Sequence, residues 1–325
     1  MARLKGSARL IAAGLAVIVT ACSSGGAGDI PTTTEAVTTT ETPEPTEATT
    51  TTTTVPASTT TTIAAPEPIP IEAPDGMELV WSDEFDGEAI DRSNWGFDIG
   101  GWGWGNGEAQ YYTDREENAR VRNGLLEIEA RSERFEDSYY TSARLLTQGL
   151  REFQYGRIEA RIKPPTGVGT WSAFWMLGAN FGRALEDPTQ SNWPDVGEID
   201  IMEYMGREPD LVLGTLHGPG YAGAGGLTRW NRQDYVVGDE FHTYAVDWNE
   251  DGIRWLYDGE VFYELGPESL GGREWVFDQP FFIILNLALG GTLGGTIALD
   301  AEFPQYMHVD YVRVYQPVPD GEPQP

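Results

Sequence analysis

Three carboxylates stand within six residues of the sequence, and their spacing fits acid–base chemistry. Glu198, Asp200 and Glu203 alternate with apolar residues, which is typical of a strand with one polar and one apolar face. Strict alternation places Glu203 on the face opposite the other two. One extra residue at Ile201 and Met202, a β-bulge, returns Glu203 to their face. Three neighbouring acids repel one another and raise at least one pKa, which is typical of a functional site.

A solvated edge strand is the alternative, because acids are harmless there. We favour a functional site because an apolar run and many tryptophans surround this stretch: Trp95, Trp102, Trp104, Trp171, Trp175, Trp193, Trp230, Trp248, Trp255 and Trp275. Trp171 and Trp175 share strand parity, so both can face one cleft. An indole beside carboxylates suits a carbohydrate, whose apolar ring face stacks on it. For a single tryptophan the alternative is core packing, which we expect for Trp248 and Trp255.

The elements that must position these residues read as an all-β domain. Short β-rich runs alternate with turn signals at Gly124–Ala130, Gly156–Ile162, Phe241–Leu265, Phe281–Leu289 and Val309–Tyr315. The third run divides into three strands at two Asp-Gly turns. The fourth is apolar enough to be buried on both faces. Since helical periodicity is nearly absent, we predict an antiparallel β-sandwich.

The chain ahead of this domain predicts export and tethering. Residues 1–21 carry three basic residues and then an apolar run, which is typical of a signal peptide. The run ends at Cys22, the only cysteine of the chain, in a setting that resembles a bacterial lipobox. We expect lipidation at Cys22 and an outward-facing membrane lipoprotein, or a secreted protein. The alternative is a chance cysteine beside an ordinary cleavage site.

Composition divides the rest of the chain. Residues 22–74 are rich in Thr and Pro without an apolar period, so we expect a disordered stalk. Residues 75–317 form the predicted domain, and 318–325 a flexible tail. The formal charge of −30 disfavours nucleic acid, anionic membranes and sulfated polysaccharides, and it suits a neutral substrate or a divalent cation. We expect a monomer that meets the membrane only through Cys22.

The stretch Trp193–Glu203 resembles the active-site strand of glycoside hydrolase family 16, in the bulged form of laminarinase-like endo-β-1,3-glucanases. The resemblance covers essentially the whole domain, including Val80–Phe85, Gly105–Thr113, Tyr155–Arg161, Ala173–Gly178 and Val309–Tyr315. It implies a concanavalin A-like β-jelly roll with a concave cleft, an endo-acting retaining hydrolase and no cofactor for catalysis. Open alternatives are mixed-linkage β-1,3-1,4-glucan, agarose or another galactan as the substrate, and a non-catalytic glucan-binding protein.

The resemblance also divides the work among the three acids. Glu198 would be the nucleophile that forms a glycosyl-enzyme. Glu203 would protonate the leaving oxygen and later activate water, and Asp200 between them would tune protonation. Retaining enzymes hold the two working carboxyls about 5–5.5 Å apart. Both glutamate side chains must therefore lean inward across Asp200.

Substrate-binding positions follow by matching. Trp193 resembles the platform under the sugar at the cleavage point. Asn106 and Arg144 resemble ligands of hydroxyls on the glycone side, which is the side that keeps the anomeric carbon. Trp171 and Trp175 resemble cleft aromatics.

Two further positions keep alternatives open. His217 resembles a histidine that faces the catalytic carboxylates, or it is a satisfied structural histidine. Asn286, alone in its apolar strand, closes the floor of the cleft or bonds to backbone. One departure from the family pattern is Ser172 in place of Pro, which bears on local rigidity and not on chemistry.

The family often carries a structural calcium, and oxygen ligands suit that ion. By the same matching, the side chain of Asp310 and the carbonyls of Glu84 and Gly124 would hold it. The alternative for Asp310 is a plain surface acid.

Overall fold

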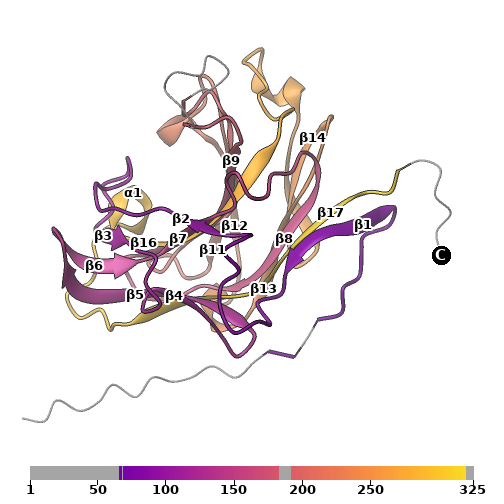
Figure 1. Ribbon diagram of the computed structural model, residues 1–325. Helices are drawn as coiled ribbons and strands as arrows, with labels where there is room; N and C mark the ends of the chain where they lie inside the picture. Colours follow the sequence, from indigo (N-terminus) through magenta and orange to yellow (C-terminus); the bar gives the residue numbers. More distant parts are fainter. Residues whose placement is uncertain (1–65, 68, 183–191, 320–325) are drawn as a thin grey trace, which may run out of the picture. The chain divides into compact units, whose positions relative to one another are not determined.

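Two β-sheets make up the part of the chain that this computed structural model describes, residues 66–67, 69–182 and 192–319 (Figure 1). The ten-stranded sheet has the order β15-β14-β13-β8-β17-β5-β6-β3, with β1 paired to β17 and β4 to β5. The seven-stranded sheet has the order β12-β11-β10-β9-β16-β7-β2. The predicted sandwich is confirmed. Described strand pairs are antiparallel, apart from the parallel pair β3–β6.

The strands of the ten-stranded sheet are β1 (Met77–Asp83), β3 (Gln110–Tyr112), β4 (Ala119–Arg122), β5 (Leu125–Phe135), β6 (Ser138–Ser142), β8 (Gly156–Lys163), β13 (His242–Asn249), β14 (Gly252–Tyr257), β15 (Glu260–Leu265) and β17 (Gln305–Pro317). Those of the seven-stranded sheet are β2 (Gly96–Phe97), β7 (Arg144–Leu146), β9 (Thr170–Gly178), β10 (Glu198–Met205), β11 (Leu211–His217), β12 (Leu227–Arg232) and β16 (Phe281–Leu289). The described helices are short: α1 (Gly291–Gly294), η1 (Gly223–Gly225), η2 (Val237–Asp239) and η3 (Pro267–Leu270). None of the helices in the described residues is long and apolar enough to cross a bilayer.

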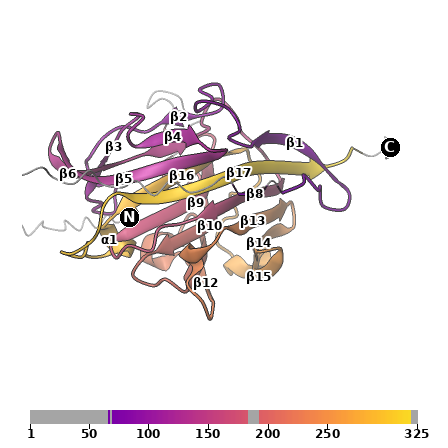
Figure 2. The ribbon, with the colours of Figure 1, turned by 90° about the horizontal axis from the view of Figure 1, so that it is seen from below.

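The core lies between the two sheets (Figure 2). Strand β8 alternates as predicted, with every second residue buried. Strand β16 is buried along its whole length, also as predicted. Trp248 and Trp255 are 2% and 0% exposed, so both are core residues.

Strand β5 departs from the predicted alternation because its polar residues are buried as well. Glu127 and Glu129 are only 4% and 3% exposed. Arg120 of the neighbouring β4 places Nη2 2.8 Å from Glu127 and 2.7 Å from Glu129. His308 of β17 lies 3.6 Å from Glu127 on the other side. These charged neighbours compensate the desolvation of both carboxylates, which sequence alternation alone would leave in solvent.

Both ends of the described domain are tied to the ten-stranded sheet. Arg313 of β17 donates to the carbonyls of Ile69 at 2.9 Å and Pro70 at 3.4 Å, two residues that the sequence assigns to the stalk. Val318 donates its backbone N–H to the carbonyl of Gly76 at 3.0 Å. The predicted signal peptide, Cys22, the stalk up to residue 65 and residues 320–325 lie outside the described residues.

Candidate active site

Strand β10 carries the predicted bulge. Its register against both neighbouring strands shifts between Asp200 and Glu203. Ile201 and Met202 both belong to the core, where one residue would stand in a regular strand. Glu198, Asp200 and Glu203 therefore share the outer face of the seven-stranded sheet.

The opposite sheet supports the bulge through a buried indole. Trp255 of β14 donates from Nε1 to the carbonyl oxygen of Asp200 at 2.8 Å, which satisfies a backbone acceptor at the irregular point of the strand. Gly214 of β11 makes room for this ring, because a Cβ at this position would lie 2.6 Å from Trp255 Cδ1. Packing between the sheets thus fixes the strand that carries the acids.

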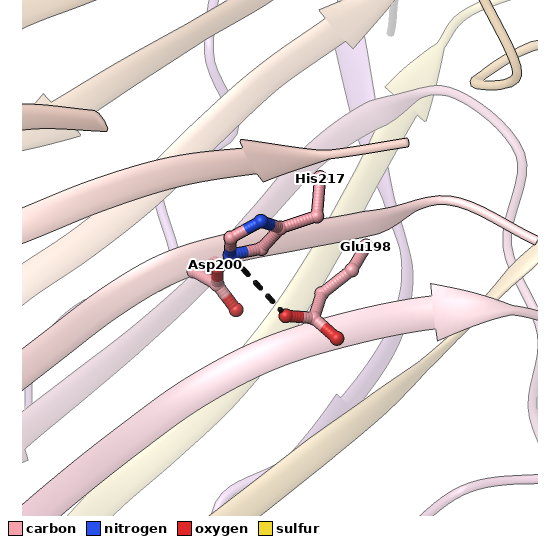
Figure 3. A group of neighbouring side chains, drawn as sticks. All are labelled: Glu198, Asp200 and His217. Carbon is pink, nitrogen blue, oxygen red and sulfur yellow. Dashed lines mark ion pairs between the residues drawn. The ribbon is translucent and has the colours of Figure 1, made fainter. Parts of the chain in front are cut away.

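Each acid has identified neighbours on the outer face. Glu203 accepts a hydrogen bond from Trp171 Nε1 at 3.2 Å through Oε1, and from Thr215 Oγ1 at 3.3 Å through Oε2. His217 of β11 places Nε2 3.2 Å from Asp200 Oδ2 and 3.6 Å from Glu198 Oε1. Figure 3 shows the imidazole lying beside the two carboxylates. The structure thus brings His217 to the acids, as the resemblance implied.

Burial raises the pKa of all three acids. For Glu203, burial and then the charge of Asp200 raise the pKa to about 8, against smaller lowering effects of His217, Trp171 and Thr215. For Glu198 the same two causes raise the pKa well above its ordinary range. Burial also raises the pKa of Asp200, and its hydrogen bond with Glu198 opposes this shift. Glu203 therefore holds a proton at neutral pH, as a general acid must.

A cavity of about 490 Å³ lies over these acids. Its lining includes all three carboxylates and the predicted residues Asn106, Arg144, Trp171, Trp175, Trp193 and Asn286. Trp171 and Trp175 face the same cavity, in agreement with their parity. Trp193, with a cis bond to Pro194, is 43% exposed, and its ring centroid lies 6.1 Å from that of His217.

Arg144 is held rigidly in the wall of this cavity. Its guanidinium lies 4.9 Å from the Trp104 ring centroid and 4.6 Å from that of Trp175. Its Nε lies 2.9 Å from Asp98 Oδ2. The two rings and the carboxylate fix the direction of the guanidinium, which leaves its other N–H groups for a ligand.

Asn286 belongs to the floor of the cavity, and its side chain forms hydrogen bonds with other side chains among the described residues. Its Oδ1 accepts from Trp175 Nε1 at 2.7 Å, and its Nδ2 donates to the Tyr112 hydroxyl at 3.1 Å. The side chain therefore orients the indole of Trp175.

Sequence reasoning missed a fourth carboxylate in this cavity, Glu108. It accepts hydrogen bonds from Asn106 Nδ2 at 3.2 Å, Gln110 Nε2 at 2.6 Å and the Tyr112 hydroxyl at 3.0 Å. Burial raises its pKa, and these hydrogen bonds and Arg144 oppose the rise. The signal was present, because Glu108, Gln110 and Tyr112 are spaced two residues apart as the chain enters β3. Asp98, Trp102 and Trp104 also line the cavity without having been predicted.

Among the predicted calcium ligands, the side chain of Asp310 already has a partner, since its Oδ2 accepts from Arg161 Nη1 at 2.7 Å. Glu84 was predicted to bind through its carbonyl, and its side chain pairs with Arg313 at 2.7 Å. Gly124 lies in the turn between β4 and β5. Among the described residues, the side-chain group with metal-ligand spacing is Glu198, Asp200 and His217, whose ligand atoms lie within 4.8 Å of one another.

Comparisons with known proteins agree with this geometry. Residues 104–313 match the family model described as glycosyl hydrolases family 16. The chain is 47% identical over 250 residues to a beta-glucanase of Rhodothermus marinus, covering 74% of this chain and 85% of the relative. The catalytic domain of an endo-1,3-beta-glucanase (laminarinase) from Thermotoga petrophila matches with a TM-score of 0.69 and 44% identity, over 74% of this chain and 98% of that one. The endo-beta-1,3-glucanase of Pyrococcus furiosus matches with a TM-score of 0.70 and 44% identity, over 74% and 95%.

Proposed function

The chain belongs to glycosyl hydrolase family 16, and we propose that it is an endo-acting, retaining hydrolase of β-1,3-glucan. The observation that carries the proposal is the common face of Glu198 and Glu203 in a tryptophan-lined cavity. Burial in this cavity raises the pKa of Glu203 to about 8. A retaining glycosidase needs one ionised carboxylate and one protonated carboxyl at the same pH. The reaction of this family needs no cofactor.

In the first step, Glu203 donates its proton to the glycosidic oxygen as the bond from that oxygen to the anomeric carbon breaks. The ionised Glu198 forms a bond to the same carbon, which gives a glycosyl-enzyme. Trp171 and Thr215 hold the Glu203 carboxyl in place through their two hydrogen bonds. In the second step, the ionised Glu203 takes a proton from water, the water oxygen bonds to the anomeric carbon, and the bond to Glu198 breaks.

Asp200 and His217 act on the pKa of Glu198 in opposite directions. Burial and then the charge of Asp200 raise that pKa. His217 lies 3.6 Å from Glu198, and its charge lowers the pKa of that carboxyl against the effect of burial.

The acidic chain and the relatives favour a neutral β-1,3-glucan over the other polymers. Reducing-sugar release from laminarin, lichenan, agarose and carrageenan tests this choice, and we expect laminarin to be the best substrate. Faster release from lichenan would replace β-1,3-glucan by a mixed-linkage glucan, and release from agarose alone would replace it by a galactan. No release of reducing sugar from laminarin would contradict the proposal.

A non-catalytic glucan-binding protein is the second candidate. It predicts that Glu198→Ser changes neither the binding of laminarin oligosaccharides nor the release of reducing sugar. The proposed mechanism predicts loss of turnover with retained binding of laminarin oligosaccharides. Glu260→Ser, an exposed acid on β15, serves as the matched control and should hydrolyse laminarin at the wild-type rate.

We also propose a structural calcium at Asp310, with the carbonyls of Glu84 and Gly124. The carboxylate of Asp310 would have to share its oxygens between the ion and Arg161, which lies 2.7 Å away. Calcium binding to the folded state alone raises the melting temperature. A melting temperature that EGTA leaves unchanged, together with no calcium after mild dialysis, would remove this part of the proposal.

For location, we propose a monomeric lipoprotein on the outer side of a bacterial membrane. The lipobox-like sequence at Cys22, the apolar run before it and the Thr/Pro-rich segment after it support this proposal. Labelling with radioactive palmitate in the native host tests it, with Cys22→Ser as the control. Equal labelling of both proteins would contradict lipidation at Cys22, and sedimentation of the purified domain tests the monomer.

A further inference from the structure

A large exposed indole stands outside the cavity on the same sheet. Trp230 lies on β12, the edge strand next to β11, and 67% of its surface is exposed. Among the described residues it has no ring or guanidinium partner. An indole that is left in water at the edge of a binding sheet has the exposed apolar surface that a ligand can cover.

Strand register places Trp230 on the face of the catalytic acids. Glu203 pairs with Leu213 of β11, and Leu213 pairs with Trp230 of β12. Directly paired residues point to the same side of a sheet, so the three form one row across three strands. Two strand spacings separate the Cα atoms of Glu203 and Trp230 by about 10 Å.

A chain of hydroxyl contacts confirms this face independently. Thr228 has the parity of Trp230, and its Oγ1 lies 3.1 Å from Oγ1 of Thr215. Thr215 in turn donates to Glu203 at 3.3 Å. The residue between Thr228 and Trp230 points the other way, since the guanidinium of Arg229 lies over the Tyr263 ring of the opposite sheet at 5.4 Å.

Trp230 stands on the side of Glu203 opposite to Arg144. The sheet order runs β12-β11-β10-β9-β16-β7, so β10 separates β12 from β7, which carries Arg144. Under the proposed function, Arg144 and Asn106 bind the part of the glucan that keeps the anomeric carbon. A glucan that crosses the acids must then continue towards β11 and β12.

We propose that Trp230 is a stacking platform for a sugar of the glucan on the leaving-group side of the scissile bond. The inference rests on the proposed function and extends the substrate site beyond the cavity to the edge strand. The apolar face of a neutral pyranose covers the exposed indole, while Thr228 beside it offers a hydroxyl to the sugar. The neighbouring Arg232 is paired with Glu208 at 3.2 Å and also with Asp210, so its charge is already compensated.

Trp230→Ala and Trp230→Phe test the platform with two kinds of substrate. Laminarin oligosaccharides carry sugars beyond the scissile bond, and a nitrophenyl laminarin oligoside has only an aryl leaving group there. We expect Trp230→Ala to lower kcat/KM for the longer oligosaccharides about three- to tenfold, mainly through KM, and Trp230→Phe to restore most of the loss. The aryl substrate should be cleaved at the wild-type rate by both variants. Transfer to added oligosaccharide acceptors should fall with Trp230→Ala, because acceptors bind on the same side.

Tyr139→Ala is the matched control, since Tyr139 is equally exposed, at 67%, but lies on β6 of the other sheet. Equal losses of kcat/KM in Trp230→Ala and Tyr139→Ala, or wild-type kinetics in Trp230→Ala, would contradict the stacking role of Trp230. Either result would leave the proposed function standing. A loss of self-association in Trp230→Ala with unchanged kinetics would assign the indole to a second copy of the chain instead. A wild-type protein that leaves laminarin intact would overturn the proposed function, and the platform with it.

Discussion

Replacing Glu203 by glutamine should stabilise the folded protein while abolishing hydrolysis. The amide has the shape of the carboxyl and can keep both contacts, since its oxygen accepts from Trp171 and its NH₂ donates to the Thr215 hydroxyl. Thr215 can then donate to Thr228, 3.1 Å away. The substitution thus removes a titrating group from a buried position without leaving a polar atom unpaired.

The sign and size follow from the raised pKa. Burial raises the pKa of Glu203 to about 8 from an ordinary value of 4.5. Between these values the folded protein holds a proton that the unfolded chain has released, so the free energy of unfolding falls as the pH rises. The fall is about 1.4 kcal/mol per pH unit, or about 3 kcal/mol between pH 4.5 and pH 7. The glutamine variant lacks this loss.

Chemical denaturation of both proteins from pH 4.5 to pH 9 measures the difference. We expect the stability of Glu203→Gln to exceed that of the wild type by a margin that widens with pH up to about 8. Glu127→Gln is the control with the opposite sign. Burial raises the pKa of Glu127, but His308 and Arg120 outweigh it and lower the pKa, so that this variant should lose most stability above pH 5. Parallel curves for Glu203→Gln and the wild type would refute a protonated, buried Glu203.

Three further predictions concern β10 and the residues that support it. The rate of hydrolysis should fall as the pH rises through about 8, where Glu203 loses its proton, and a pH–rate profile without this alkaline limb would contradict the role of Glu203. Trp255→Phe leaves the Asp200 carbonyl without its donor and should cost about 1–3 kcal/mol of stability, together with activity, whereas unchanged denaturation would show that the bulge needs no such support. Gly214→Ala puts a Cβ 2.6 Å from the Trp255 ring and should lower the free energy of unfolding by about 1–3 kcal/mol; wild-type stability would mean that the indole can move aside without cost.

The sequence predicted the catalytic strand well because its information is local. The parity of Glu198 and Asp200 and the extra residue before Glu203 suffice to infer the bulge, and the register shift agrees. Parity also placed Trp171 and Trp175 in one cavity.

Contacts between distant segments could not be predicted in this way. Arg144 and Trp104 meet because β7 and a loop converge on the cavity, which no periodicity encodes. The buried acids of β5 look like solvent-facing residues, because the compensating Arg120 lies on another strand. The sequence left two roles open for Asn286, in the cleft floor or in a bond to backbone, because its partner Tyr112 is 174 residues away in sequence.

The bulge of β10 also determines which codons this strand can lose. Ile201 and Met202 both face the interior, so deleting either codon restores strict alternation and leaves all three acids aligned. Deleting the codon for Ile199 would instead set Glu198 and Asp200 on opposite faces. Natural length variation in a catalytic strand of this kind should therefore concentrate at positions 201 and 202.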